Sequence, residues 1–275
     1  MKKLDKHITA VPEWDKSAKQ IWNERFEALV TDDTDDTDVI GEDTDVTKTV
    51  QLWSRIKYIV SVAAVFIILI SVTAALYKKE ISAQLGQTRI THLPDGSSAE
   101  LSAGTSISYR PLLWMFSPCV EMKGEAYFSG RHTTDFTVKT DNGDIMALGT
   151  SFNVRNYHDK LSVACIEGKI RVANGKSSVI LTANMQATTE NGLIKTQHFT
   201  ETEDITGWTK GVFSFNNEPL GEVLFDVERY YGVKVSTPEN IDTLRYTGRF
   251  TRDKHPEDVL QIICQTYGIT LKLIR

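Results

Sequence analysis

The longest apolar stretch of the chain runs from Tyr58 to Tyr77 and contains no charged residue. A hydrocarbon core about 30 Å thick needs roughly 20 helical residues to cross it, so residues 58–77 predict one transmembrane helix with a tyrosine at each interface. A buried soluble helix is the less favoured alternative, because such helices are seldom apolar on all sides over this length. A cleaved signal peptide is also less favoured, since 57 residues precede the stretch.

The residues that flank this stretch leave its orientation open. Three basic residues lie close to it on each side, namely Lys48, Arg55 and Lys57 before it and Lys78, Lys79 and Arg89 after it. The positive-inside rule therefore gives a tie. A short N-terminal piece ahead of a much longer C-terminal part favours export of the longer part.

Residues 1–30 predict one amphipathic helix. The apolar residues Trp14, Ile21, Trp22, Phe26 and Leu29 recur mostly at helical spacing, with polar residues mostly opposite. A lone helix of this length is marginal in water and cannot bury these aromatic side chains against itself. It could fold onto its own segment or lie on the membrane. A protein partner is favoured, because the polar face is mixed in charge rather than basic.

Residues 31–57 predict an acidic, disordered linker and a juxtamembrane segment. Thr31 to Thr47 contains eight acidic residues, no basic residue and few apolar ones, so this part has little to bury and repels itself. The acidic residues do not match the spacing of an EF-hand loop, which needs a glycine at position six and a glutamate at position twelve.

Residues 84–198 predict an all-β domain of short antiparallel strands, solenoid-like or sandwich-like. Alternating apolar and polar runs occur at residues 136–139, 145–148, 151–157, 161–166, 169–173 and 179–181. Turn sequences separate such runs, namely Pro94-Asp95-Gly96, Asn142-Gly143, Asn174-Gly175 and Asn191-Gly192.

Residues 207–275 predict a small α+β domain that repeats a β-α-β unit twice. A shift of 36 positions places Glu222-Val223-Leu224 on Asp258-Val259-Leu260 and Tyr231-Gly232-Val233 on Tyr267-Gly268-Ile269. In each copy a proline lies near the start of the predicted helix and a glycine fits its C-terminal cap.

Composition and motifs exclude several classes of function. The 275-residue chain has a net charge of −5, divided into −4 before residue 58 (9 basic, 13 acidic) and −1 afterwards (22 basic, 23 acidic), so neither part has the basic footprint of a nucleic-acid-binding protein. The three cysteines favour buried free thiols over a Cys119–Cys165 disulfide. His92, His132, His158 and His198 lack metal-ligand spacing, and Glu121, Glu125 and Glu167 could form a carboxylate pair only if the fold joins them. Catalytic motifs are missing; the sequence therefore predicts no enzyme, metal or cofactor.

The motifs after the apolar stretch resemble the FecR family of membrane-spanning anti-sigma factors in Gram-negative cell-surface signalling. The resemblance rests on the order of Leu93-Pro94-Asp95-Gly96-Ser97, Leu101–Ser106, Gly124–Phe128, Phe136–Val138, Leu148–Val154 and Glu167-Gly168. The segments Trp208–Leu220, Tyr230–Gly232 and Thr247–Phe250 are similar to the C-terminal domain of FecR-like proteins. That domain in turn resembles the secretin and TonB N-terminal short (STN) domain.

The resemblance implies a single-pass protein of the inner membrane with residues 1–57 in the cytoplasm and 78–275 in the periplasm. It implies an extracytoplasmic-function sigma factor as the partner of the N-terminal helix, with Trp14, Ile21, Trp22, Phe26 and Leu29 as binding candidates. It also implies a periplasmic partner, the N-terminal signalling domain of a TonB-dependent outer-membrane receptor. An intramembrane or periplasmic protease would release the N-terminal fragment. The alternative is a membrane-anchored periplasmic binding or scaffold module without a role in transcription.

Overall fold

The structure is a computed structural model that describes residues 46–130, 136–147, 149–175, 177–190, 192–237, 241 and 243–274. Its first element is α2 (Val46–Leu76), whose window Lys57–Ala74 has a mean hydropathy of 2.2 and is not buried against the protein. The apolar helix expected at 58–77 is therefore present, and it begins twelve residues earlier, inside the segment expected to be a linker. Residues 63–275 form one compact unit.

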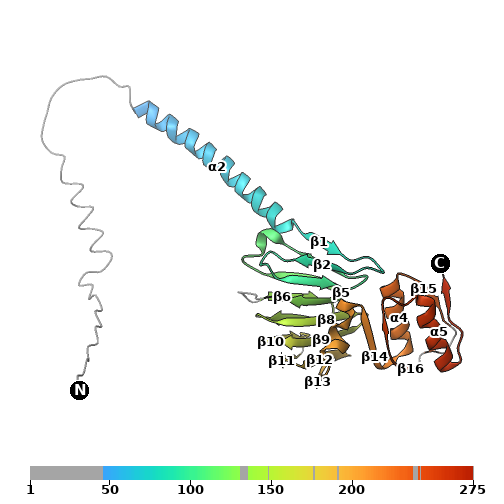
Figure 1. Ribbon diagram of the computed structural model, residues 1–275. Helices are drawn as coiled ribbons and strands as arrows, with labels where there is room; N and C mark the ends of the chain where they lie inside the picture. The colour runs from blue at the N-terminus through green and yellow to red at the C-terminus, as the bar shows by residue number, and fades with distance from the viewer. Residues whose placement is uncertain are drawn as a thin grey trace, which may run out of the picture. The chain divides into compact units, whose positions relative to one another are not determined.

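The β domain is a sandwich of two sheets that share one long strand, β5 (Cys119–Ser129). The first sheet has the order β1 (Lys79–Ser82), β4 (Ser106–Tyr109), β5, β6 (Phe136–Thr140), β7 (Gly143–Ala147), β10 (Lys169–Ala173) and β11 (Ser178–Thr182). The second has the order β2 (Arg89–His92), β3 (Ser98–Leu101), β5, β8 (Ser151–Tyr157), β9 (Lys160–Glu167), β12 (Met185–Glu190) and β13 (Leu193–His198). Figure 1 shows these strands stacked one on another.

The strands match the expected runs, with one exception in their direction. Strands β5 and β6 are parallel, whereas the alternating pattern predicts antiparallel strands throughout. The sequence pattern could not predict the parallel pairing. Alternation determines which side chains face the core, but it does not determine which strands pair or in which direction.

Gly124 allows β5 to pass from one sheet to the other. Its φ of +107° is unfavourable for other residues, and an added Cβ would lie 2.8 Å from the Cα of Thr105. The Thr105 hydroxyl donates to the Glu125 carbonyl at 3.0 Å and accepts from the Glu125 amide at 2.9 Å. The side chain of Thr105 thus takes the place of a strand partner at the point where β5 changes sheets.

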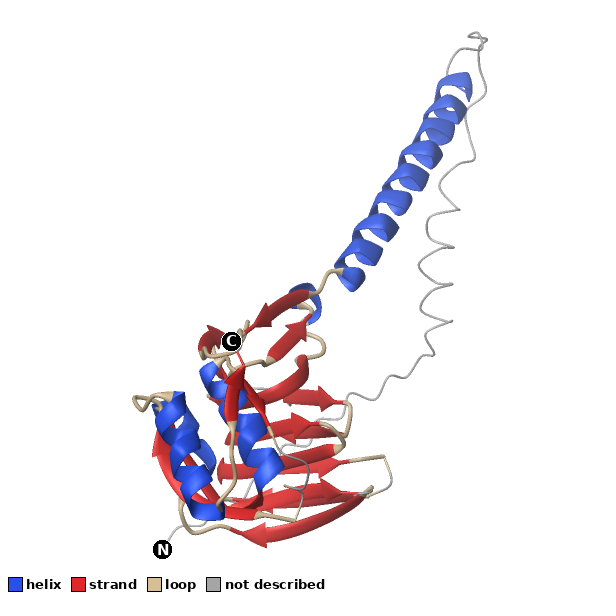
Figure 2. Cartoon of the chain, turned by 90° about the vertical axis from the view of Figure 1, so that its right-hand side faces the viewer, coloured by secondary structure: helices blue, strands red, loops and turns tan. Residues whose placement is uncertain are grey.

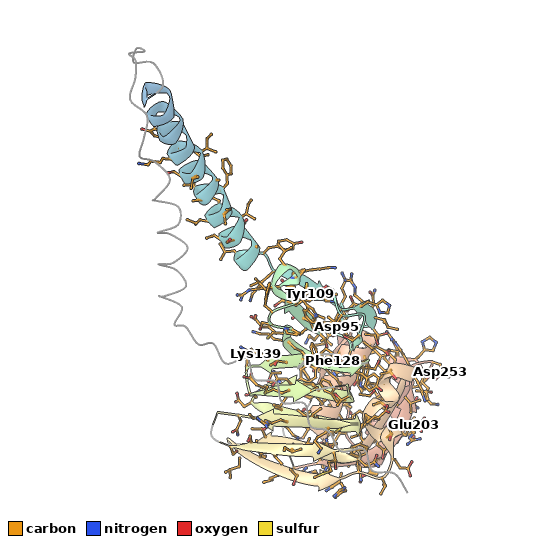
Figure 3. All side chains as sticks on the ribbon, turned by 90° about the vertical axis from the view of Figure 1, so that its left-hand side faces the viewer. Asp95, Tyr109, Phe128, Lys139, Glu203 and Asp253 are labelled. Carbon is orange, nitrogen blue, oxygen red and sulfur yellow. The ribbon has the colours of Figure 1, made fainter. Side chains whose placement is uncertain are left out.

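The core of the sandwich contains the inward-facing residues of both sheets. Phe128, Phe136 and Phe152 are fully buried, with ring centroids 5.2 to 6.4 Å apart, and burial of each such side chain stabilises the fold by about 1.5–3 kcal/mol. Phe128 lies within the stack of strands, and Tyr109 lies at its end (Figure 3).

The C-terminal domain begins with α3 (Thr202–Thr206) and the 3-10 helix η2 (Gly207–Lys210). It continues with β14 (Val212–Pro219), α4 (Leu220–Tyr231), β15 (Lys234–Ser236), β16 (Arg245–Thr251), α5 (Pro256–Tyr267) and β17 (Lys272–Ile274). The first strands of the two copies pair, β14 with β16, and so do the second strands, β15 with β17. Helices α4 and α5 lie side by side (Figures 1 and 2). The expected double β-α-β repeat is confirmed, with Gly232 and Gly268 ending the helices at φ of +68° and +65°.

Candidate functional site

Four charged side chains meet where the outer face of the second sheet contacts helix α4. Glu125 and Arg155 belong to the β domain, and Asp226 and Arg229 belong to α4. Nη2 of Arg155 donates to both carboxylate oxygens of Asp226 at 3.0 Å, and its Nη1 donates to Glu125 at 3.2 Å. Arg229 donates to Asp226 at 2.9 Å and to the carbonyl of Ala103 at 2.8 Å. Their four formal charges cancel, so these residues form a neutral ionic network between the domains.

Neutral side chains beside this ionic network bind both carboxylate oxygens of Glu125. The Tyr230 hydroxyl donates to Glu125 at 3.2 Å, and the Asn153 amide donates to the other oxygen of Glu125 at 3.3 Å. The indole N–H of Trp208 donates to Asn153 at 3.1 Å. Trp208 and Tyr230 belong to the C-terminal domain, and both are buried. The hydrogen bonds therefore extend the contact between the domains beyond the charged groups.

Exclusion of water sets the electrostatics of the ionic network. The side chains of Glu125, Asp226 and Arg229 are 4%, 7% and 5% exposed. Desolvation lowers the pKa of Arg155, but the carboxylates of Asp226 and Glu125 outweigh it and hold this pKa well above its ordinary value. Burial, with the Glu125 charge, raises the pKa of Tyr230 well above its ordinary value, so its hydroxyl remains a donor. The network therefore holds the two domains together through charged hydrogen bonds that are largely shielded from water.

A second contact between the domains involves the loop after β1. The Gly86 amide donates to the carbonyl of Arg229 at 2.8 Å, and Arg252 donates to the carbonyl of Gly86. Gly86 has a φ of +76°, and an added Cβ would lie 3.4 Å from the Tyr231 carbonyl oxygen. The left-handed backbone of this loop therefore favours glycine where the loop closes on the end of α4.

A groove of about 970 Å³ runs beside the ionic network, between the outer face of the second sheet and the C-terminal domain. Its β-domain side includes Ser162, Gln186, Thr188 and Gln197 from β9, β12 and β13. A ladder of hydrogen bonds crosses this face, from Gln197 to Gln186 at 3.0 Å and from Gln186 to Ser162 at 2.7 Å. The face is polar and held in one arrangement.

Strand β14 forms the other side of the groove. Five consecutive residues, 212–216, line it. Strand β14 pairs with β16 along one edge, and its other edge has no strand partner among the described residues. The lining contains seven carboxylates (Glu125, Glu190, Glu201, Asp204, Glu218, Glu222, Asp226) and three basic side chains (Arg155, Lys160, Arg249). The groove is therefore acidic and bordered by a strand with one unpaired edge.

The structure places few of the residues singled out from the sequence in this site. Trp14, Ile21, Trp22, Phe26 and Leu29 lie outside the described residues. Glu125 joins the ionic network, whereas Glu121 is on the surface and binds Lys78 at 2.6 Å, so these two carboxylates do not form a pair.

The histidines and cysteines in the part of the chain that the structure describes are not gathered into a site. His92, His158 and His198 are exposed, and His132 lies outside the described residues. Among the described residues no group of three metal-binding side chains occurs. All three cysteines are free, and only Cys165 is buried, so the expectation of buried thiols is wrong for Cys119 and Cys264. Cys119 is the first residue of β5 and Cys264 lies in the last turn of α5, and both are partly exposed to solvent.

Sequence reasoning missed the ionic network as a whole. One signal was present: Asp226 and Arg229 fall within the apolar stripe of the predicted helix, next to Val223 and Val227. Charges on a buried helix face need partners, and Arg155 on β8 is such a partner. Their distance apart in sequence hides the connection.

Known proteins similar to this chain agree with the architecture. The FecR protein family matches residues 79–171, and the FecR C-terminal family matches residues 212–275. Two crystal structures of a proposed anti-sigma factor from Parabacteroides distasonis ATCC 8503 are similar over most of their length. One is 31% identical with a TM-score of 0.63, covering 70% of this chain and 93% of that one. The other is 30% identical with a TM-score of 0.64, covering 72% and 99%.

A search of curated proteins finds no match. One family match lies in the sandwich and the other in the C-terminal domain. The chain therefore belongs to the FecR family of anti-sigma factors.

Proposed function

We propose that this protein is an inner-membrane anti-sigma factor that crosses the bilayer once, with residues 1–57 in the cytoplasm and 78–275 in the periplasm. The observation that carries the proposal is an exposed apolar helix of mean hydropathy 2.2, directly before the residues that match the FecR and FecR C-terminal families. An apolar helix with this exposure is stable in a bilayer and costly in water. Family membership supplies the regulatory role.

The N-terminal segment binds an extracytoplasmic-function sigma factor in this proposal. Trp14, Ile21, Trp22, Phe26 and Leu29 supply an apolar stripe that suits a hydrophobic groove on the partner. Aromatic residues in such a stripe usually contribute most of the binding free energy. The protein inhibits the sigma factor if the sigma factor is active without the N-terminal segment. It is a positive regulator if the sigma factor needs the released segment for activity.

The periplasmic domains receive the signal from the N-terminal signalling domain of a TonB-dependent outer-membrane receptor. The acidic groove along β14 supports a docking place for that domain, because an unpaired strand edge can accept an added strand through backbone hydrogen bonds. The excess of carboxylates favours a partner strand with basic side chains. A protease that cuts the chain in or near the membrane would then free the N-terminal segment with its sigma factor.

Co-purification tests the cytoplasmic part of the proposal. The full chain, solubilised in mild detergent, should retain one sigma factor from its own cells, and Trp22→Ala with Phe26→Ala should reduce the retained amount at least tenfold. The matched control is Glu24→Ala with Glu27→Ala on the polar face, which should retain the sigma factor. Equal retention by both variants would show that the apolar stripe is not the binding surface.

The groove is tested by substituting a residue of its floor. Thr188→Arg places a long side chain in the groove. The control, Ile180→Arg, places the same side chain outside the groove, on the exposed strand β11 of the other sheet. Affinity for the purified receptor signalling domain should fall at least tenfold with Thr188→Arg only. It should also weaken with salt, since exposed charges are screened. A loss with Ile180→Arg instead would move docking to the opposite sheet.

A further inference from the structure

The loop between β4 and β5, residues 110–118, exposes three large apolar side chains. Met115 is 90% exposed, Phe116 is 86% exposed and Leu112 is 60% exposed. An exposed apolar cluster of this kind on a β sandwich calls for something that covers it. The contacts within the loop and its place in the chain identify the covering surface.

The loop has a defined structure that holds these side chains outward. Trp114 is buried, and its ring lies 5.4 Å from that of Tyr109 and 5.9 Å from that of Phe136. The amide of Phe116 donates to the carbonyl of Leu113 at 3.0 Å. Because Trp114 is fixed inside the domain, Met115 and Phe116 beside it remain outside.

Chain connectivity places the loop next to the point where α2 ends. Only Tyr77 and Lys78 separate Leu76, the last residue of α2, from the start of β1, a path of about 11 Å at most. Strand β1 leads away from the helix end, and the antiparallel strand β4 returns toward it, with Tyr109 opposite Lys79. The loop continues from Tyr109 in that same direction. Tyr109 lies at the end of the β domain (Figure 3).

The surrounding charges suit a lipid surface. Lys79 and Arg110 are exposed beside the loop, and Lys78 forms an ion pair with Glu121 at 2.6 Å. Basic side chains around an apolar tip are favourable at a bilayer, where apolar groups enter the acyl boundary and cations meet lipid phosphates. The bilayer that α2 crosses would lie so close to this loop that it would hinder the approach of a protein partner.

We infer that residues 112–116 insert into the outer leaflet of the membrane that α2 crosses, as a second attachment for the β domain. This inference rests on the proposed membrane anchorage. With two attachments, the domain is held against the bilayer in one orientation rather than swinging on the short connection after α2. The groove along β14 would then face a fixed direction in the periplasm.

Photo-crosslinking tests the inference in the full chain, reconstituted in vesicles of phosphatidylethanolamine and phosphatidylglycerol. A benzophenone amino acid replaces Phe116 in one sample, Phe66 of α2 in a second and Leu193 of β13 in a third. Phe66 is 59% exposed and Leu193 is 66% exposed, so all three positions tolerate the probe. Mass spectrometry then counts lipid adducts.

The inference predicts lipid adducts at positions 66 and 116, with at least tenfold fewer at 193. Adducts at 66 but not at 116 would overturn the loop attachment and leave the membrane anchorage intact. Adducts at 116 to a second copy of the chain would also overturn it, in favour of self-association. Absence of adducts at 66 would reject the proposed anchorage, and the inference with it.

Discussion

The carboxylate of Asp226 is the point where the two domains are joined most directly. It accepts hydrogen bonds from Arg155 of the β domain and from Arg229 of its own helix. If this carboxylate were removed, the buried Arg229 and the partly buried Arg155 would have less negative charge nearby. A buried pair contributes little net stability compared with apolar residues, but loss of one partner is costly.

Asp226→Ala should lower the free energy of unfolding by about 3–5 kcal/mol, the usual cost of leaving a buried charge unpaired. Urea denaturation of the full chain in detergent, followed by tryptophan fluorescence, measures it. Glu222→Ala is the matched control, since Glu222 is 4.0 Å from Arg155 and 38% exposed and should cost less than about 1 kcal/mol. Similar small losses in both variants would mean that the ionic network is not what joins the domains.

The buried thiol of Cys165 should make the protein less stable at alkaline pH. Burial raises the pKa of its thiol to about 11, above its value of about 8.5 in an unfolded chain. Between these values the unfolded state loses the proton and the native state keeps it, so stability is complete below about pH 8.5 and falls as pH rises toward 11. Cys165→Ala should remove about 2 kcal/mol of this loss between pH 8 and pH 10.5. A constant difference between the two proteins over that range would contradict the argument.

At the scale of elements, β5 joins the two sheets by one glycine. Gly124→Ala should destabilise the protein by at least 2 kcal/mol, because it adds a clash with the Thr105 backbone to the cost of a positive φ. Gly175 has a φ of +79°, and nothing lies within 4 Å of an added Cβ. Gly175→Ala should therefore lower the free energy of unfolding by only about 1–2 kcal/mol. The difference in urea midpoint isolates the clash. Identical midpoints would show that Thr105 moves aside freely.

Helix α2 is long and apolar enough to cross a membrane, and a charge at its centre tests that role. Ile67→Asp places a carboxylate in the middle of the window Lys57–Ala74, where insertion costs about 2.5–3.5 kcal/mol more. The variant should be depleted from carbonate-washed membranes. Ile180→Asp, at a residue 53% exposed on β11, should stay in them. Full retention of the Ile67 variant would argue against α2 as the anchor.

Most elements could be predicted from the sequence, because each depends on local periodicity or turn chemistry. The bounds of β8 and β10 agree with the alternating runs at 151–157 and 169–173. Helices α4 and α5 end at the glycines that the repeat indicated. The division of β5 between two sheets and its parallel pairing with β6 could not be predicted, since both depend on how distant strands come together.

At the scale of the whole molecule, the family could be identified from motifs, while the site could not. The ionic network joins positions 125, 155, 226 and 229, and the groove combines five strands of the sandwich (β5, β8, β9, β12 and β13) with β14. No local pattern links such distant positions. The exposed tip at Met115 and Phe116 was also hidden, because an apolar run in sequence does not reveal which side chains the fold buries.

Control of transcription from the membrane is the role that we propose for this chain, and sequencing of cellular RNA tests it. Cells that lack the protein are compared with cells that carry the Trp22→Ala, Phe26→Ala variant and with cells that carry the Glu24→Ala, Glu27→Ala control. We predict one shared set of transcripts that changes in the first two strains and stays at the wild-type level in the control. An unchanged transcript profile in the deletion strain would contradict the account and favour a periplasmic scaffold.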